Sequence, residues 1–435
     1  MPDDTIFALA TGAGRSAVAV IRLSGPCARD ALADFTGVSP EPRHAHFARF
    51  RDPQTNETLD QGLALWFPGP NSATGEDCAE FHLHGSRAVV DAILSLLRRR
   101  TGLRAAEPGE FARRAFINGK MDLSQAEALA DLIDAQTEFQ RRQALRVAGG
   151  ALRRQVDDWR GALVEASALL AAELDFSDEG DVGSFSPDAL GRVLRPLMAR
   201  MDEVLRRAPA SERLRAGFMV LILGPPNAGK STLLNLLARR EVAIVSEIPG
   251  TTRDMIEVEL NLGGMPVTLI DTAGLRETED AVERIGVGRA RARAGEADLL
   301  LWLSEAGAAP PPDVDTGGAE ILRIAAKADE FPPQVGCLAI SSRTGLGIDE
   351  LCEEIATRAR AMLGDGSSAL VIRERHRDAI GAARDFIAAA LTPGRPLELV
   401  AEEIRSAARS LERIVGAIDV EQVLDAVFSR FCIGK

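Results

Sequence analysis

The octapeptide GPPNAGKS at residues 224–231 constrains the fold of this chain more than any other segment. It matches the pattern G-x-x-x-x-G-K-[ST], whose backbone amides wrap around phosphate groups. The continuous apolar run at 218–223 before it predicts a parallel strand buried on both faces, and the apolar segment 232–238 after it predicts a helix. Strand, glycine loop and helix N-terminus together predict a nucleotide-binding α/β domain.

Three motifs in order predict hydrolysis of a nucleoside triphosphate with magnesium. In the loop, Lys230 would neutralise the outer phosphates and the Ser231 hydroxyl would ligate Mg²⁺. The segment 271–274, DTAG, follows a predicted strand; its aspartate supports the metal and its glycine amide can follow the γ-phosphate. Between them lies GTTRD at 250–254, a threonine-bearing loop able to close on the metal as a switch.

The segment 326–329, AKAD, is similar to the guanine-reading pattern N-K-x-D but lacks the leading Asn. Asp329 can accept hydrogen bonds from the ring nitrogen and exocyclic amine of guanine, and the stem of Lys327 can cover the ring face. The segment 341–343, SSR, follows another predicted strand and fits the supporting base loop. The sequence therefore predicts guanine, bound more weakly than by a complete motif.

The catalytic water needs a partner, because Leu275 occupies the position where Ras-like proteins carry the water-orienting Gln. The Asn227 carbonyl oxygen and the backbone carbonyls of 246–250 could form an oxygen cage for a monovalent cation that acts as an arginine finger would. Glu283 could polarise the water. On residue type alone, a solvated helix glutamate is the more frequent alternative for Glu283.

The length of 435 residues exceeds what one hydrophobic core supports, so two or three domains are expected. Short β-rich runs predict an α+β domain at the N-terminus, and Ala/Leu/Arg-rich stretches on both sides of the α/β domain predict helices. Among these are a long helix over 122–147 and a helix that begins at Ser186-Pro187 and ends near residue 208. The predicted domains are residues 1–120 (α+β), 121–214 with 366–435 (helical, discontinuous) and 215–365 (an inserted Ras-like G domain). Two separate helical bundles are the alternative.

Composition excludes several classes of protein. The net charge of −13 argues against non-specific coating of nucleic acid. Five scattered cysteines lack zinc-site spacing and suit reduced thiols in a cytoplasm: Cys27, Cys78, Cys337, Cys352 and Cys432. The N-terminus lacks the pattern of a secretory signal, and no apolar run reaches the roughly 20 residues of a membrane span. We expect a cytoplasmic protein with no membrane contact.

Several long segments resemble one family. They are GTTRD at 250–254, DTAGLR at 271–276, FCIGK at 431–435 and PGEFARRAFINGKMDLSQAEALADLID at 108–134. Together they resemble the MnmE (TrmE) family of tRNA-modifying GTPases, over essentially the whole chain.

This resemblance implies a folate-binding and dimerising N-terminal domain, and a G domain that pairs across a homodimer when GTP and K⁺ are bound. It implies an FAD-dependent partner, MnmG (GidA), in a heterotetrameric or larger complex. The pair would install an aminomethyl or carboxymethylaminomethyl group on C5 of the wobble uridine of certain tRNAs. The one-carbon donor would be a tetrahydrofolate derivative, in the methylene or 5-formyl form.

The resemblance also implies residue roles. Potassium would be held by Asn227, Ser246, Ile248 and Thr251, and magnesium by Ser231 and Thr252. Glu283 would position the water, and Cys432 would have a site role, against the alternative of a small buried hydrophobe. Folate would contact Arg22, Glu80, Lys120 and Lys435. The nucleotide would contact Asn227, Ala228, Gly229, Lys230, Ser231, Thr232, Ser246, Glu247, Ile248, Pro249, Gly250, Thr251, Thr252, Asp271, Thr272, Ala273, Gly274, Lys327, Asp329, Ser341, Ser342 and Arg343.

Other features have plainer interpretations. His82 and His84 alternate on a predicted strand and are expected to lack the acidic partners of a metal site. The basic segment 373–377 is expected to be a solvated helix start, with tRNA phosphate contact as the alternative. Two rival functions stay open: a ribosomal-RNA-binding GTPase switch similar to Era or Der, and a folate-dependent one-carbon transferase without energetic need for GTP.

Overall fold

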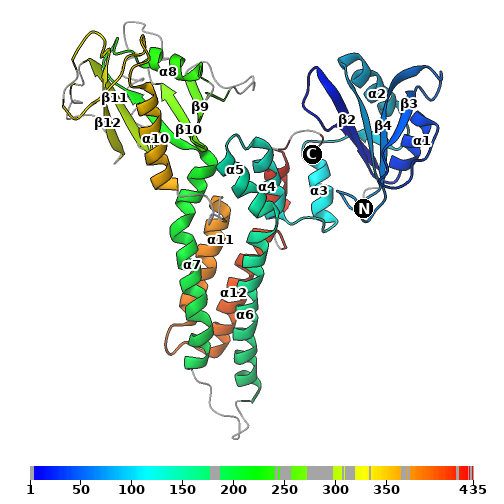
Figure 1. The fold of residues 1–435 in the computed structure, drawn as a ribbon. Coiled ribbons are helices and arrows are strands. Elements are labelled where there is room, and N and C mark those ends of the chain that lie inside the picture. Colours follow the sequence, from blue (N-terminus) through cyan, green and yellow to red (C-terminus); the bar gives the residue numbers. More distant parts are fainter. Residues whose placement is uncertain are drawn as a thin grey trace, which may run out of the picture. The chain divides into compact units, whose positions relative to one another are not determined.

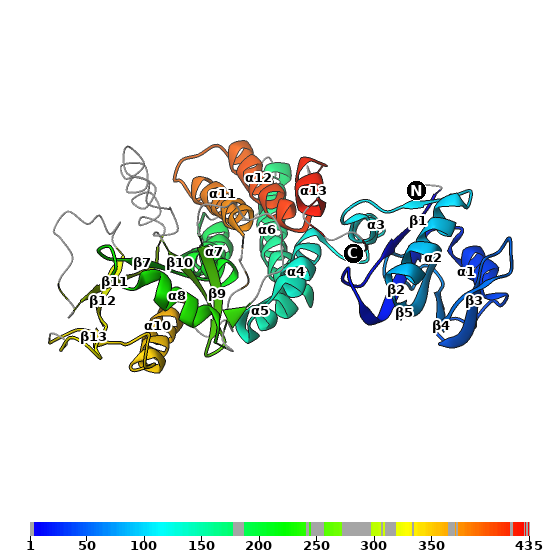
Figure 2. The ribbon, with the colours of Figure 1, turned by 90° about the horizontal axis from the view of Figure 1, so that it is seen from above.

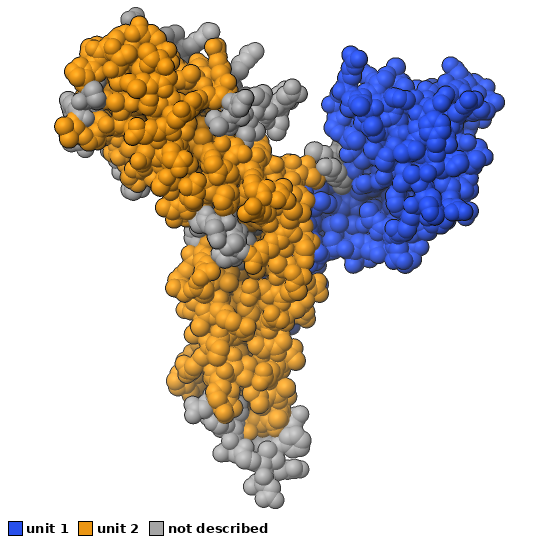
Figure 3. Space-filling model, viewed as in Figure 1, with its two compact units in different colours: residues 1–130, 409–435 blue, residues 131–408 orange. Residues whose placement is uncertain are grey.

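The computed structural model describes residues 4–176, 187–240, 243–244, 256–271, 297–305, 308, 319–332, 335–363, 370, 373–417, 421–429, 431 and 434. The chain forms two compact units, residues 1–130 with 409–435 and residues 131–408 (Figure 3). The predicted fold class is confirmed, because an α+β N-terminal part, a helical part and a phosphate-loop α/β part are all present. The predicted domain boundaries stay predictions.

The first unit contains a sheet in the order β3-β4-β5-β2-β1-β6, in which the β1–β6 pair is parallel and the other pairs are antiparallel (Figure 2). Its strands are β1 (Thr5–Leu9), β2 (Ser16–Ser24), β3 (His46–Arg51), β4 (Thr58–Phe67), β5 (Cys78–Gly85) and β6 (Leu103–Ala105). Three helices accompany it: α1 (Ala28–Thr36), α2 (Arg87–Arg99) and α3 (Glu110–Ile117).

Alternation along the strands divides this sheet into two chemically different faces. On one face, Ile21 of β2 and Phe81 of β5 are buried with residues of α1 and α2. On the opposite face, Phe111 of α3 packs against Ile6 of β1 in a small cluster. Further across this opposite face, Arg22 and Glu80 stay half-buried. The sheet therefore presents polar side chains beside an apolar core.

The helical segments are α4 (Leu123–Asp134), α5 (Glu138–Ala148), α6 (Ala151–Phe176), α7 (Pro187–Ala216), α11 (Glu374–Ala390), α12 (Leu397–Val415) and α13 (Glu421–Phe428). The helix expected over 122–147 is broken, because Thr137 is extended and caps α5 in a reciprocal capping box with Gln140. The helix α7 begins at Pro187 as expected but continues beyond the predicted end near residue 208.

Helices from before and after the α/β part lie side by side. The helix α11 packs along α7, and Arg384 Nε of α11 pairs with Asp202 Oδ1 of α7 at 2.9 Å (Figures 1 and 2). This packing is the contact that a single discontinuous helical domain requires. Among the helices that the structure describes, none is long and apolar enough to cross a membrane.

The second sheet has the order β13-β12-β11-β7-β10-β9-β8. Its strands are β7 (Phe218–Leu223), β8 (Ala243–Ile244), β9 (Ile256–Leu262), β10 (Met265–Asp271), β11 (Leu299–Glu305), β12 (Glu320–Ala326) and β13 (Leu338–Ala339). Among the described strands of this sheet, the pairs β8–β9 and β9–β10 are antiparallel and the other pairs are parallel.

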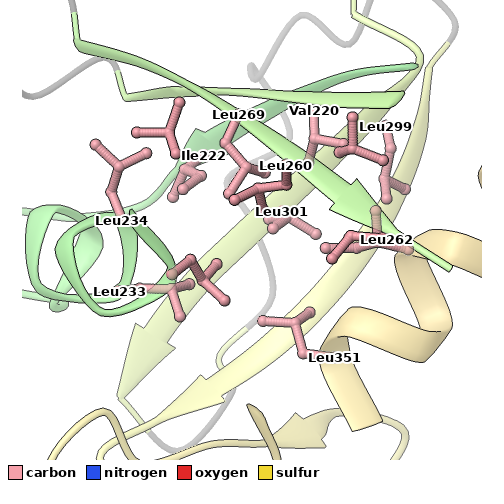
Figure 4. Close-up of a cluster of buried hydrophobic side chains, with 14 of the residues drawn as sticks. Val220, Ile222, Leu233, Leu234, Leu260, Leu262, Leu269, Leu299, Leu301 and Leu351 are labelled. Atoms are coloured by element: carbon pink, nitrogen blue, oxygen red, sulfur yellow. The ribbon is translucent and has the colours of Figure 1, made fainter. Parts of the chain in front are cut away.

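The core of this sheet confirms that β7 is buried on both faces. Val220 and Ile222 point into the cluster shared with helices α8 (Lys230–Ala238) and α10 (Ile348–Leu363) (Figure 4). Leu221, between them, belongs to a second cluster with Ile270 and Leu300. A strand buried on both faces needs a continuous apolar sequence, which is what residues 218–223 supply.

Candidate functional site

The phosphate-binding loop follows β7 directly and leads into α8. Gly224 has φ 151°, and a Cβ at this position would come within 2.0 Å of the Leu303 carbonyl oxygen on the neighbouring strand β11. Gly229 has φ 94° and ends the loop, so α8 begins at Lys230. The close approach of β11 thus requires glycine at position 224, at the start of the loop. The left-handed backbone of Gly229 turns the N-terminus of α8 toward the loop.

Inside the loop, Lys230 lies across its own turn. Its ammonium donates to the carbonyl oxygens of Gly224 at 3.0 Å and Pro225 at 2.9 Å. Asn227 adopts φ 61°, a conformation that Asn tolerates better than most residues, and is exposed. Ala228 is buried, whereas Ser231 and Thr232 are exposed in the first turn of α8.

Asp271 is placed next to this loop by the strand register. It is the last residue of β10, and β10 pairs in parallel with β7, with Asp271 opposite Ile222. Ligands in such sheets bind beyond the carboxyl ends of the strands. Several predicted site residues lie outside the described residues: Ser246, Glu247, Ile248, Pro249, Gly250, Thr251, Thr252, Thr272, Ala273, Gly274, Leu275 and Glu283.

The predicted base-reading residues come together at the ends of β12 and β13. Asp329 pairs with Arg343, and a hydrogen bond from the Ser341 hydroxyl together with that pairing holds the pKa of Asp329 below its usual value. Ser341 is fully buried, and Ser342 is half-buried beside it. An ionised Asp329 is an acceptor only, as the N–H groups of guanine require.

Backbone contacts hold this region together where the motif lacks its Asn. Ala326 is buried at the end of β12, and the Ala328 amide donates to the Ile340 carbonyl oxygen at 3.0 Å. Lys327 has φ 55°, and its ammonium pairs with Glu305 Oε1 at 2.5 Å. Sequence reasoning missed Glu305; its position at the carboxyl end of a buried strand was the available signal.

In the N-terminal sheet, Arg22 and Glu80 are direct cross-strand neighbours on β2 and β5. Arg22 donates from Nε to Glu80 Oε1 at 3.0 Å, and its Nη2 lies 2.9 Å from the same oxygen. Burial alone would raise the pKa of Glu80, but hydrogen bonds from His82 and Arg22 hold it below its usual value. Glu80 is therefore ionised at neutral pH.

The other predicted folate residues are placed less completely. Lys120 is exposed just after α3, and its backbone amide donates to the Ala115 carbonyl oxygen at 2.8 Å. Cys432 and Lys435 lie outside the described residues, but Gly434 packs so closely on the end of β1 that a Cβ would come within 2.2 Å of the Leu9 carbonyl oxygen. Gly434 thus lies against the same sheet.

The two histidines of β5 are not isolated from acidic side chains: His82 Nε2 lies 3.0 Å from Glu80 Oε2, and His84 Nδ1 lies 2.8 Å from Asp60 Oδ1. The reason is that residues two apart on a strand share a face, and β4 lies alongside β5. Each has a carboxylate neighbour, but among the described residues they do not belong to a group of three or more side chains that could hold a metal ion.

The basic segment 373–377 is not simply a solvated helix start either. Arg373 Nη2 pairs with Asp131 Oδ1 at 2.9 Å, and His376 is fully buried. Glu374 is exposed, whereas the arginines of the segment are half-buried. Helix packing, which the local sequence does not show, turns the start of α11 inward.

A phosphate-binding loop at the carboxyl edge of a mostly parallel sheet, with a guanine-type reader at the end of β12, defines a P-loop nucleotide-binding protein. Here that domain is joined to a helical part and to a separate N-terminal sheet. Two family models match the chain in turn: "GTP-binding protein TrmE N-terminus" over residues 5–120 and "MnmE helical domain" over residues 123–432. The chain belongs to the MnmE (TrmE) family.

Curated relatives agree over the full length. The chain is 52% identical to the tRNA modification GTPase MnmE of Beijerinckia indica, over 99% of this chain and 96% of that protein. It is 52% identical to the protein of the same name in Azorhizobium caulinodans, over 99% of both. A solved structure of Aquifex aeolicus Era covers 39% of this chain and 66% of its own, at 22% identity and a TM-score of 0.26, too distant to bear on the assignment.

Proposed function

We propose that this chain is a potassium-stimulated GTPase whose hydrolysis cycle serves the modification of the tRNA wobble uridine. The observation that carries the proposal is an intact phosphate-binding loop in a chain similar over its whole length to tRNA modification GTPases. This combination favours the GTPase of tRNA modification over the ribosomal-RNA-binding switch.

The nucleotide would be held at the carboxyl edge of the second sheet. Lys230 would exchange its two carbonyl partners for the more strongly accepting oxygens of the β- and γ-phosphates. The exposed Ser231 hydroxyl and Thr252 would ligate Mg²⁺, with Asp271 in support; the metal would neutralise charge that develops on the phosphates. These residue types suit a magnesium–nucleotide complex, as does the position of Ser231 in the first turn of α8.

The missing water-orienting Gln is the reason to propose potassium. Asn227 presents an exposed side chain from a left-handed turn inside the loop, where an amide oxygen can face a cation near the phosphates. Carbonyl oxygens of Ser246, Ile248 and Thr251 would complete the cage, and Glu283 would position the water. The rest of the proposed nucleotide contacts come from residues 227–232, 246–252, 271–274, 327, 329 and 341–343.

The modification chemistry would lie outside the G domain. The ionised Glu80 would accept hydrogen bonds from the pterin of a tetrahydrofolate derivative. The negative charge of the folate's glutamate-tail carboxylates would be balanced by Arg22, Lys120 and Lys435. Cys432 would lie at the same site. A homodimer working with the FAD-dependent MnmG in the cytoplasm would then transfer the one-carbon unit to uridine C5.

The test is nucleoside analysis of wobble uridine in tRNA from cells that lack this gene. Deletion should abolish the aminomethyl-type modification, and the wild-type gene should restore it. A Lys230→Ala gene should not restore it, because GTP hydrolysis is required. Unchanged modification in the deletion strain would overturn the proposal. Full restoration by Lys230→Ala would instead support the one-carbon transferase that has no need for GTP.

A further inference from the structure

On the N-terminal sheet, the face opposite α1 and α2 carries a histidine that the proposed folate site does not use. The strand register places His82 of β5 directly between Leu63 of β4 and Val20 of β2. Glu80 lies two residues away on the same face, opposite Arg22. Apolar neighbours on both sides leave the Glu80 carboxylate as the natural hydrogen-bonding partner of the His82 ring.

The way Arg22 contacts Glu80 is unusual. An arginine beside a carboxylate commonly forms a fork in which two nitrogens contact two different oxygens. Here Nε and Nη2 of Arg22 both contact Oε1, at 3.0 and 2.9 Å. The second oxygen, Oε2, is held by His82 Nε2 at 3.0 Å. Since an ionised carboxylate only accepts, the imidazole nitrogen is the donor.

We propose that His82 is a positioning residue for the folate site. By holding Oε2, it keeps the Glu80 carboxylate from rotating into a two-oxygen fork with Arg22. The remaining acceptor capacity of Oε2 then stays available for N–H donors of a pterin, a planar heterocycle with neighbouring ring and exocyclic N–H groups. The inference rests on the folate site proposed above.

Partial burial makes this arrangement matter energetically. The side chain of Glu80 is 16% exposed and that of His82 is 29% exposed, so water competes weakly for either. In such surroundings, a hydrogen bond to a charged group contributes more stabilisation than a hydrogen bond between two neutral groups. A ligand that donates to an oxygen already in place avoids the cost of reorienting it.

Variants of the full-length chain test the idea with 5-formyl-tetrahydrofolate as the probe, by equilibrium dialysis. His82→Leu removes the donor and should weaken binding about tenfold. His82→Gln keeps an N–H donor of similar reach and should restore affinity to within about twofold of the wild type. Equal loss in both variants would overturn the positioning role, because a lost donor could not be its cause.

A matched control is available on the same strand. His84 pairs with Asp60 at 2.8 Å, also a histidine–carboxylate contact, and its side chain is largely exposed. His84→Leu should leave binding of 5-formyl-tetrahydrofolate within about twofold of the wild type. A tenfold loss here would show that any histidine change on β5 disturbs the sheet and would overturn the specific role of His82.

Two further measurements separate this inference from the folate proposal. Glu80→Gln should weaken 5-formyl-tetrahydrofolate binding; if it does not, the folate site itself is wrong. If Glu80→Gln weakens binding and His82→Leu does not, only the role of His82 is wrong. Independently of any ligand, a crystal structure of His82→Leu should show Arg22 on both Glu80 oxygens. Persistence of the single-oxygen contact would overturn the inference.

Discussion

The Lys230 ammonium lies 3.0 Å from the Gly224 carbonyl oxygen and so joins the two ends of the phosphate-binding loop. In the nucleotide complex, charged phosphate oxygens should replace this carbonyl. Lys230→Ala removes a cation aimed at developing phosphate charge, and we expect kcat for GTP hydrolysis to fall about 100-fold or more. Phosphate release under saturating GTP measures the effect. Arg239→Ala, at the exposed end of the same helix, is the control and should keep the wild-type rate.

Hydrolysis should depend on the monovalent cation. At constant ionic strength, replacing K⁺ by Na⁺ should lower the GTPase rate by about tenfold or more, because the smaller ion fits the proposed carbonyl cage poorly and Leu275 stands in the sequence where a water-orienting Gln would be. Asn227→Ala should remove the difference between the two salts, whereas Asn235→Ala, exposed on α8, should preserve it. Equal wild-type rates in the two salts would contradict the potassium mechanism.

Restoring the missing Asn of the base reader should strengthen nucleotide binding. Ala326 is buried beside the base loop, where an amide could add a hydrogen bond that the present chain lacks. Ala326→Asn should lower the Kd for GTP about fivefold, the equivalent of one neutral hydrogen bond. Ala326→Val adds volume without an amide and should not improve binding. Fluorescent GTP-analogue titration compares the three proteins; an unchanged Kd for Ala326→Asn would show that the backbone contacts already suffice.

Arg114 should be the most sensitive arginine of the N-terminal unit. It is 3% exposed and contacts the carboxylates of Asp4 at 2.8 Å, Glu76 at 3.1 Å and Glu110 at 3.0 Å. Arg114→Ala removes the arginine partner of Glu76 and leaves Asp4 and Glu110 with Arg104 alone, and it should lower the free energy of unfolding by about 3 kcal/mol. The neighbouring Arg113→Ala removes an exposed pair and should cost less than about 1 kcal/mol.

The pH dependence of the Arg114→Ala defect follows from Glu110. Burial would raise the pKa of this carboxyl, but hydrogen bonds from Arg104, the Glu107 amide and Arg114 hold it below 4.5. A lowered folded pKa means that the ionised group stabilises the protein above pH 4.5, and that this contribution is lost as the pH falls through the folded value. The difference in melting temperature between wild type and Arg114→Ala should therefore be full at pH 7 and shrink below about pH 4.5. A constant difference would contradict the ion-pair origin.

Local chemistry explains why so much of the nucleotide site could be predicted. The loop 224–231 is one contiguous segment, and its glycines, lysine and serine have roles that depend on their immediate neighbours. The strand at 218–223 was equally readable because double burial requires an uninterrupted apolar run. The break between α4 and α5 was missed, although the capping residues Thr137 and Gln140 were its local signal.

Pairs that are distant in sequence could not be predicted in this way. The sequence alone determined a P-loop guanine-nucleotide domain between helical segments, because those signals are periodic or contiguous. Only the tertiary structure decided that Arg22 meets Glu80 through one oxygen while His82 holds the other, and that Arg373 turns inward to Asp131. Strand register and helix packing set such contacts, and both depend on the collective burial of the core, which no single segment encodes.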